Sequence, residues 1–268
     1  ADYDLAAKDI AYSAFGHAGQ KCSASSIVIL VGSAAKSKRF RRQLEDAVTS
    51  LHVGHPDDPK TQMGPMIDAP TGKLLEGLTV LERGEKWLVK PAQLDETGKL
   101  WSPGVRYHVR PNSKSHKTEY FGPVLSVMTA PNLEAAIALQ NAVDYGLTSG
   151  IHSLDQVEIN TWLKGIQAGN LYVNRGITGA IVQRQPFGGW KRSSIGPTAK
   201  AGGPNYLATL TDFGTKPATA REVIKDKQLL QILALAAASE LTDGEVESLT
   251  RGLQNDIAAL RDYFSVNT

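Results

Sequence analysis

The sequence contains one cysteine, Cys22, in 268 residues, so no disulfide can form within the chain. This scarcity fits a reducing compartment, and we expect a cytoplasmic protein. No apolar run approaches the ~20 residues that cross a bilayer, so we expect no membrane span. The net charge is only +2 and no long basic run is present, so the sequence lacks the electrostatic signature of nucleic-acid binding.

Several familiar site motifs are also missing. No Gly-x-Gly-x-x-Gly follows a strand-like run and no phosphate loop occurs, so we expect no nucleotide-binding half within this chain. The absence of a Gly-x-Ser-x-Gly elbow argues against a serine hydrolase. His52 and His55 are close enough in sequence for two zinc ligands, but no third ligand is evident, so we predict no metal site.

The pattern of apolar residues predicts an α/β fold, with a mostly parallel sheet flanked by helices, because strand-like and helix-like segments alternate along the chain. The predicted strands are 27–31, 86–90, 105–110, 124–128, 147–152 and 171–173. The predicted helices are 33–51, 69–83, 133–141 and 156–166, after a helix that begins near Ala1. The β-branched run 27–31 is typical of a strand buried on both faces.

The chain changes character near residue 210. Residues 217–239 and 243–264 are predicted to form two amphipathic helices without clustered chemical groups. We therefore divide the sequence into a domain over 1–210 and a helical extension over 211–268. Since the sequence starts without Met and reaches Cys22 almost at once, we interpret it as a fragment of a longer protein.

The first candidate site is the loop Gly19-Gln20-Lys21-Cys22-Ser23, between a predicted helix and a predicted strand. A thiolate is a strong nucleophile, and Lys21 places positive charge beside it. A half-buried structural thiol is the alternative interpretation. A cysteine hydrolase is another, with His17 as the base, but nothing in the sequence identifies an acid to orient that imidazole.

The second candidate is Glu119-Tyr120-Phe121-Gly122-Pro123, ahead of a predicted buried strand. Residues two apart in an extended segment share a face, so Glu119 could hold a ribose diol while Phe121 packs against a heterocycle. A strand-entry turn with a surface glutamate is the alternative.

The third candidate is the glycine-rich stretch 174–189. Its glycines allow the backbone to approach an anion and to donate N–H groups to it. An irregular loop without a ligand is the alternative.

In their order and spacing, these segments resemble the catalytic domain of the aldehyde dehydrogenase superfamily. The resemblance rests on the Cys22 loop, on the Glu-x-Phe-Gly-Pro motif at Glu119, and on the connecting loop with Met63-Gly64-Pro65. It covers residue 1 to about 210. Within the superfamily, residues 169–189 resemble the L-glutamate γ-semialdehyde (1-pyrroline-5-carboxylate) dehydrogenases. Residues 196–207 are similar to the dehydrogenase module of bacterial bifunctional proline-catabolic enzymes.

The resemblance implies a role for each matching residue. Cys22 would be the nucleophile, Glu119 would hold the nicotinamide ribose of NAD, and Phe121 would pack nearby. Ser23 would touch the carboxylate of a small-molecule aldehyde substrate. The remaining matches are Gly179 and Ala180, whose backbone would bind the same carboxylate, and Phe187, which would contact the aliphatic part.

The sequence departs from the family in lacking its N-terminal half, which carries the cofactor domain, a Glu-Leu-Gly-Gly general-base segment and an oxyanion-hole asparagine. We therefore predict that this polypeptide alone has no dehydrogenase turnover. The longer protein would be a homo-oligomer. A non-catalytic assembly fragment and a dehydrogenase for a different aldehyde are the alternative interpretations.

Overall fold

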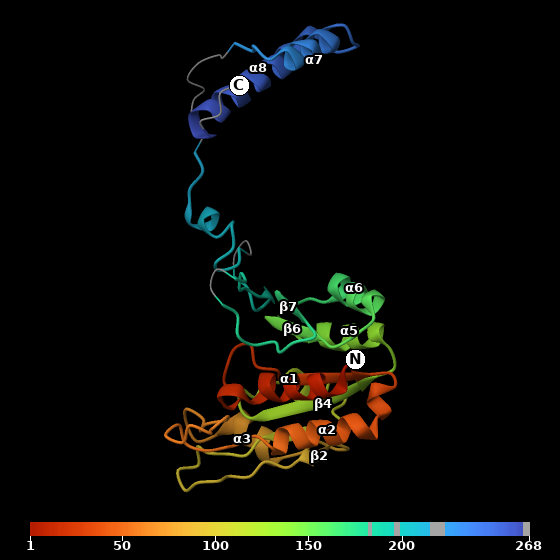
Figure 1. Cartoon of the computed structure of the whole chain (residues 1–268), viewed down its shortest axis with the longest axis vertical. Helices are drawn as coiled ribbons and strands as arrows, with labels where there is room; N and C mark the ends of the chain where they lie inside the picture. Colours follow the sequence, from red (N-terminus) through yellow and green to blue (C-terminus); the bar gives the residue numbers. More distant parts are fainter. Residues whose placement is uncertain (182–183, 196–198, 215–222, 265–268) are drawn as a thin grey trace. The chain divides into compact units, whose positions relative to one another are not determined.

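The computed structural model describes residues 1–181, 184–195, 199–214 and 223–264 (Figure 1). It divides into two compact units, Ala1–Leu210 and Thr211–Thr268. The predicted motif residues 182 and 196–198 and the predicted helical residues 217–222 lie outside the described residues.

The first unit is built on a four-stranded sheet. Its strand order is β1 (Ile27–Val31), β4 (Val124–Ala130), β3 (Gly104–Tyr107) and β2 (Lys86–Val89). The β1–β4 and β3–β4 pairs are parallel and β2–β3 is antiparallel. The prediction of a mostly parallel α/β sheet is confirmed.

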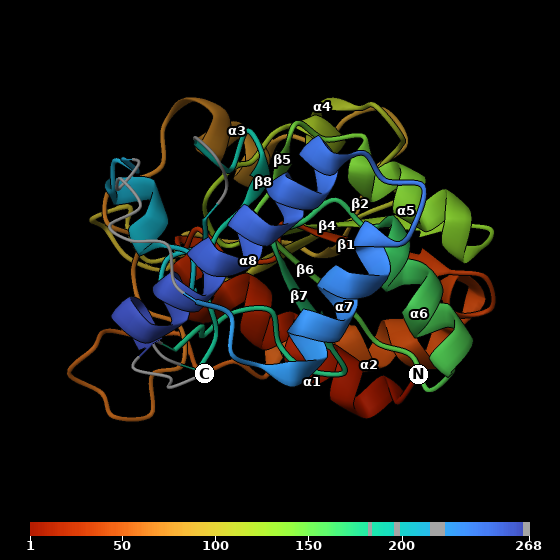
Figure 2. The same ribbon diagram turned by 90° about the horizontal axis from the view of Figure 1, so that it is seen from above.

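Helices cover both faces of this sheet. In the view from above, α1 (Tyr3–Phe15) and α2 (Lys38–Thr49) lie on one side and α5 (Leu133–Asn141) on the other (Figure 2). The spacing of Phe40, Leu44 and Val48 puts all three buried side chains on one face of α2. The predicted helix 33–51 is interrupted, because Ser37 caps α2 after a short 3₁₀ turn, η2 (Ala34–Lys36).

The prediction that β1 is buried on both faces is wrong. Of its five residues only Leu30 is buried, whereas five consecutive residues of β4, Val124 to Met128, are all buried. The reason is position: β4 is central, but β1 is an edge strand of the described sheet and one of its sides lines a cavity. A continuous β-branched run therefore marks a strand that is apolar on both faces but only partly covered.

A second, two-stranded parallel sheet pairs β6 (Thr148–Ile151) with β7 (Asn170–Val173), and α6 (Gln156–Gly165) connects them. A short antiparallel pair joins β5 (Tyr145–Gly146) to β8 (Trp190–Lys191), which the sequence pattern did not predict. The 3₁₀ turn η3 (Leu207–Leu210) closes this unit.

Two short helices lie along the chain between α2 and β4. Helix α3 (Gly72–Thr79) is shorter than the predicted 69–83, and α4 (Lys114–Lys117) was not predicted. Buried His116 anchors α4: its Nδ1 lies 2.9 Å from the Asn112 N–H and its Nε2 3.0 Å from the Leu139 carbonyl. Burial lowers the pKa of His116, so the neutral ring accepts at Nδ1 and donates from Nε2.

The second unit contains α7 (Lys227–Ala237) and α8 (Asp243–Phe264). Helix α7 begins later than predicted, because Asp226 accepts hydrogen bonds from the N–H groups of Gln228 and Leu229 and so caps it. Glu245 accepts a bond from the Thr242 N–H at the start of α8, as in a capping box.

Candidate functional site

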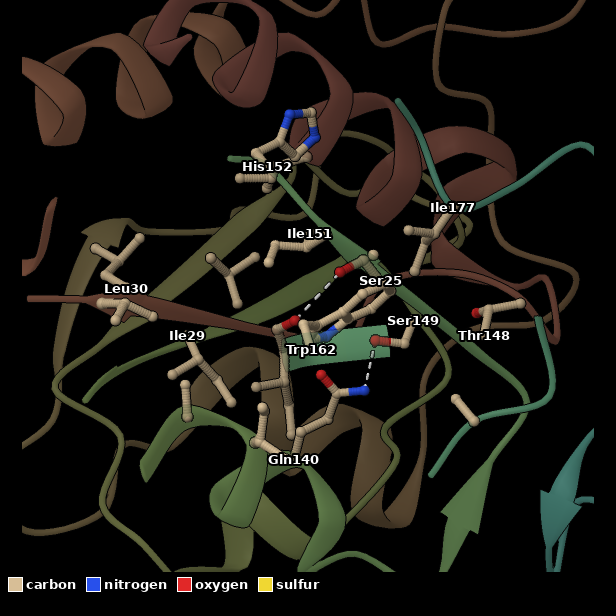
Figure 3. A pocket seen from close by; sticks show the side chains of 18 of the residues that line it. Ser25, Ile29, Leu30, Gln140, Thr148, Ser149, Ile151, His152, Trp162 and Ile177 are labelled. Atoms are coloured by element: carbon tan, nitrogen blue, oxygen red, sulfur yellow. Dashed lines mark hydrogen bonds between the residues drawn. The ribbon is translucent and has the colours of Figure 1, made fainter. Parts of the chain in front are cut away.

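A cavity of about 1120 Å³ lies within the first unit, between α1, β1, α5, β6 and α6 (Figure 3). Three of the predicted site residues, Cys22, Glu119 and Phe121, contribute to its lining. Two segments about one hundred residues apart in sequence are thus brought to one cavity.

The Cys22 loop follows a strained turn. Residues His17, Ala18 and Gly19, in the turn η1 (Gly16–Gly19), have φ values of 54°, 54° and 68°. Left-handed backbone at a non-glycine residue costs about 1–3 kcal/mol and persists only where the surrounding structure imposes it. The turn reverses the chain after α1 and leaves the Cys22 thiol exposed. This exposure does not fit the half-buried structural thiol considered above.

Gln20 joins this loop to two others. Its side-chain amide donates to the Phe121 carbonyl (3.2 Å), and its Oε1 accepts from the Ile67 N–H (3.0 Å). Gln20 is not among the site residues predicted from the sequence. The signal that could have found it is a residue with both a donor and an acceptor two positions before Cys22.

Gly19 and Gly122 bring the backbones of the two segments close together. A Cβ on Gly19 would lie 2.1 Å from the carbonyl oxygen of Gly122, with which it cannot coexist. Its positive φ also favours glycine. Both facts mean that only glycine allows the Cys22 loop to lie against the Glu119 segment.

We therefore expect Gly19→Ala to lower the free energy of unfolding by about 2–4 kcal/mol, since it combines left-handed strain with a backbone clash. Gly72→Ala is the matched control, because Gly72 also has positive φ (51°) but has open space around the position of a Cβ. Urea unfolding of both variants measures the difference. Equal losses for the two would show that the contact with Gly122 is unimportant.

The Glu119 segment differs from the extended conformation that was expected. Phe121 has a φ of 60°, so the chain turns there instead of continuing as a strand. Tyr120 is buried and its hydroxyl lies 3.3 Å from Ser115 Oγ, while Glu119 and Phe121 are exposed and line the cavity. The two residues reach the same cavity although the premise of a flat strand was wrong.

Ser23 is buried, and its carbonyl oxygen lies 3.4 Å from the Thr148 hydroxyl on β6. Ser23, the residue after Cys22, is therefore tied to the second sheet. Its side chain is not among the residues that line the cavity.

Ser13, at the end of α1, connects the Cys22 loop to the glycine-rich stretch. Its carbonyl accepts from the Ser25 N–H (2.9 Å), and its hydroxyl accepts from the Ile177 N–H (3.0 Å). Gly179 follows shortly after, with a φ of 85° and open space where a Cβ would be, and Ala180 is exposed. Neither Gly179 nor Ala180 lines the cavity. No sequence signal marked Ser13.

Phe187 is half-buried and exchanges backbone hydrogen bonds with Ala201 (3.0 and 3.1 Å). Buried Asn170 on β7 holds both neighbours of Phe187, since it donates to the Pro186 carbonyl and accepts from the Gly188 N–H. Phe187 is also outside the lining of the cavity. Ser13 and Asn170 thus hold the loops that carry Gly179, Ala180 and Phe187, but none of these three residues lines the cavity with Cys22.

Among the described residues, no cluster of three or more histidine, cysteine or acidic side chains could hold a metal ion. The Nε2 atom of His52 instead lies 2.8 Å from Oδ2 of Asp58. In the same part of the chain, every helix is too short or too polar to cross a membrane.

A sequence model described as the Aldehyde dehydrogenase family matches residues 1–215. The chain belongs to the aldehyde dehydrogenase family. This explains why the Cys22 and Glu119 segments, although distant in sequence, are held at one cavity.

Individual members of the aldehyde dehydrogenase family resemble the chain closely. The 1-pyrroline-5-carboxylate dehydrogenase of Bacillus subtilis is 38% identical over 211 residues, which are 77% of this chain and 40% of that protein. The structure of Proline Utilization A (PutA) from Corynebacterium freiburgense has a TM-score of 0.77 and 49% identity, covering 100% of this chain and 26% of that one. A 1-pyrroline-5-carboxylate dehydrogenase from Thermus with bound NAD has a TM-score of 0.64 and 34% identity, covering 72% of this chain and 37% of that one. The chain therefore spans less than half the length of these relatives.

Proposed function

We propose that the chain forms the nucleophile-bearing part of an NAD-dependent dehydrogenase that oxidises L-glutamate γ-semialdehyde to glutamate in proline catabolism. The observation that carries the proposal is the placement of Cys22, Glu119 and Phe121 around one cavity. The names of the relatives, 1-pyrroline-5-carboxylate dehydrogenase and Proline Utilization A, support the choice of substrate.

The residues at the cavity fit a nicotinamide cofactor. The Glu119 carboxylate is exposed and accepts no hydrogen bond from the described residues, so its oxygens are available to a ribose diol. Phe121 is 39% exposed, and its ring offers an apolar face to a flat heterocycle. NAD⁺, when bound, supplies the hydride acceptor.

Cys22 provides the covalent step. Its sulfur adds to the aldehyde carbon and forms a thiohemiacetal, whose oxyanion can accept a hydrogen bond from the Cys22 backbone N–H. Loss of hydride from that carbon leaves a thioester. Water then attacks the thioester carbon, the carbon–sulfur bond breaks, and glutamate and the free thiol result.

The substrate carboxylate would be held beyond the reacting carbon. We assign this role to Ser23 and to the backbone of Gly179 and Ala180, where the positive φ and free surroundings of Gly179 allow N–H groups to converge on an anion. Phe187 would contact the aliphatic carbons, with its backbone held through Asn170. In the 268-residue chain alone, the Cys22 thiol would react with a thiol-labelling reagent, but the chain would not turn over the aldehyde. The reason is that the activation of water is assigned to residues outside this chain. The longer protein would be a homo-oligomer.

The experiment compares aldehydes on a complete protein that carries this chain, with NADH formation as the readout. Glutamate semialdehyde should give a kcat/KM at least about a hundredfold higher than butanal, since the plain aldehyde would leave the anion-binding groups of Ser23, Gly179 and Ala180 unpaired. Similar kcat/KM values for the two aldehydes would contradict glutamate semialdehyde as the substrate and indicate a different aldehyde. Steady NADH formation by the 268-residue chain would contradict the missing water activation, and an unreactive Cys22 thiol would favour an assembly role.

A further inference from the structure

The C-terminal end of α5 is bound by side chains that come from other segments of the chain. The last carbonyls of a helix have no partners within it and carry partial negative charge, so they attract N–H donors and cations. Here His116 Nε2 lies 3.0 Å from the Leu139 carbonyl oxygen, and Lys117 Nζ donates to the Ala142 carbonyl. Both donors lie on α4, just before Glu119. The end of α5 is thus tied to the segment proposed to hold the nicotinamide ribose.

A third donor at this helix end is Lys191, on β8. Its ammonium nitrogen lies 2.6 Å from the carbonyl oxygen of Asn141 and 2.9 Å from that of Val143. The backbone of Lys191 is left-handed, with a φ of 52°, a conformation that persists only where the surrounding structure imposes it. The residue is half-buried, and its burial lowers the pKa of the ammonium group. A half-buried lysine that donates to two carbonyls is part of the packed structure and not a solvated surface charge.

A short connection joins Lys191 to the loop that carries Phe187. Asn170 accepts a hydrogen bond from the Gly188 N–H (3.0 Å), and only two residues separate Gly188 from Lys191. Strand β8 is in turn paired with β5, which follows α5 along the chain. The loop proposed to contact the aliphatic part of the substrate is therefore fixed by Asn170 next to Phe187 and by Lys191 at the end of α5.

The last residue of α5, Asn141, holds the helix end against the connection between α6 and β7. Its side-chain amide donates to the Gly165 carbonyl (2.8 Å), and its Oδ1 accepts from the Gln167 N–H (2.9 Å). That connection leads directly into Asn170, the first residue of β7. The end of α5 is therefore a fixed junction of several segments, and a change in one of them can be transmitted to the others.

We propose that Lys191 is a positioning residue that couples the substrate side of the site to its cofactor side. Lys191 and Lys117 bind three consecutive carbonyls at the end of α5, so the loop with Phe187 and the segment with Glu119 keep a fixed relation to each other. Loss of the Lys191 ammonium group leaves two of these carbonyls without a donor and displaces the third, to which Lys117 donates. The proposal rests on the proposed function, in which Glu119 and Phe187 receive their roles.

The neighbouring Arg192 is a cation of the same segment that lacks these contacts. Its guanidinium lies 3.5 Å from the Asp144 carboxylate, and the two side chains are 69% and 70% exposed. Exposed pairs of this kind contribute little, because water screens the charges and both side chains lose freedom. Arg192 is therefore the matched control for Lys191: it has the same charge and lies next to it in the chain, but its partner is a surface carboxylate.

The test measures aldehyde kinetics and NAD binding on a complete dehydrogenase that carries this chain. Lys191→Met should raise the KM for glutamate semialdehyde by at least about fivefold, because the loop with Phe187 loses its anchor. It should also raise the Kd of NAD by at least about threefold, although Lys191 lies outside the Glu119 segment. The kcat should change by a smaller factor than either constant, since the Cys22 loop is intact. A lysine that only stabilised the helix would lower the melting temperature without moving these two constants.

Further variants locate the effect. Lys117→Met should raise the KM for glutamate semialdehyde by at least about threefold from the cofactor side, and it carries the test if Lys191→Met does not fold. Both constants of the double variant should stay within about twofold of the worse single variant, because the two lysines act through one helix end. Lys191→Arg keeps a charged N–H donor and should return both constants to within about twofold of the wild type. Arg192→Met should also stay within about twofold.

Three results would overturn the proposal. The first is a Lys191→Met enzyme with the wild-type KM and the wild-type Kd of NAD. The second is a pair of separate effects, in which Lys191→Met alters only the KM and Lys117→Met only the Kd of NAD. The third is a Lys191→Arg enzyme as impaired as Lys191→Met. A wild-type enzyme that does not prefer glutamate semialdehyde would instead overturn the proposed substrate, and the ratios of variant to wild type with the aldehyde that it does oxidise would still decide the role of Lys191.

Discussion

Cys22→Ser in a complete dehydrogenase carrying this chain should lower kcat by at least about a thousandfold, because a serine hydroxyl without an activating base is a far weaker nucleophile than a thiolate. The structure presents the Cys22 thiol as exposed at the rim of the cavity, on a loop that Gln20 and Gly19 hold against the Phe121 segment. NADH formation at saturating aldehyde measures the loss.

Two controls separate chemistry from folding in this experiment. NAD binding, followed by quenching of protein fluorescence, should be unchanged in Cys22→Ser, since Glu119 and Phe121 are intact. Lys21→Ala keeps the sulfur and should cost about tenfold or less, because it removes only a neighbouring charge. A Cys22→Ser enzyme that keeps more than a tenth of the normal kcat would show that Cys22 is not the nucleophile.

The largest effect on stability is expected for Arg106→Met. The Arg106 guanidinium on β3 is buried with Glu85, and their side chains are each 1% exposed, with Nη2 2.9 Å from Oε2. Arg106 also donates to the carbonyls of Gly77 and Val80. Removing it leaves a buried carboxylate without its counter-charge, and we expect a loss of about 3–5 kcal/mol in the free energy of unfolding.

Urea unfolding checks this value against two further variants. Arg83→Met removes an exposed arginine from the loop before β2 and should change stability by less than about 0.5 kcal/mol. Arg106→Met combined with Glu85→Leu should be more stable than Arg106→Met alone, because neither charge is then buried unpaired. If the double variant is no better, the cost of Arg106→Met comes from lost packing.

The ion pair between Arg106 and Glu85 also supports the candidate site. The Arg106 guanidinium carbon lies 5.4 Å from the centroid of the Tyr120 ring, and Tyr120 separates Glu119 from Phe121 in the sequence. A buried charge network thus supports the residue that turns its two neighbours toward the cavity. Glu119 and Phe121 were predicted from the sequence but the supporting Arg106 was not, since partners about twenty to thirty residues apart in sequence leave no local pattern.

Local periodicity predicted most of the first unit. The ranges of β1 and α5 match the predictions residue for residue, and β2, β6, β7 and α6 differ at their ends by one or two residues. The predicted ranges were too long where a side chain or a backbone angle delayed the start of an element or ended it early. Asp226 starts α7 late, and His108, with a φ of 65°, ends β3 before the predicted residue 110.

The amino-acid sequence by itself determined the alternating helices and strands, the family, and the identity of the candidate nucleophile and carboxylate, because these depend on residue type and short spacing. The tertiary structure alone decided that Cys22, Glu119 and Phe121 share a cavity, and that Gln20 and Ser13 hold the loops together. Those relations are set by side chains and backbone groups that meet only after the chain has folded, so no window of the sequence contains them.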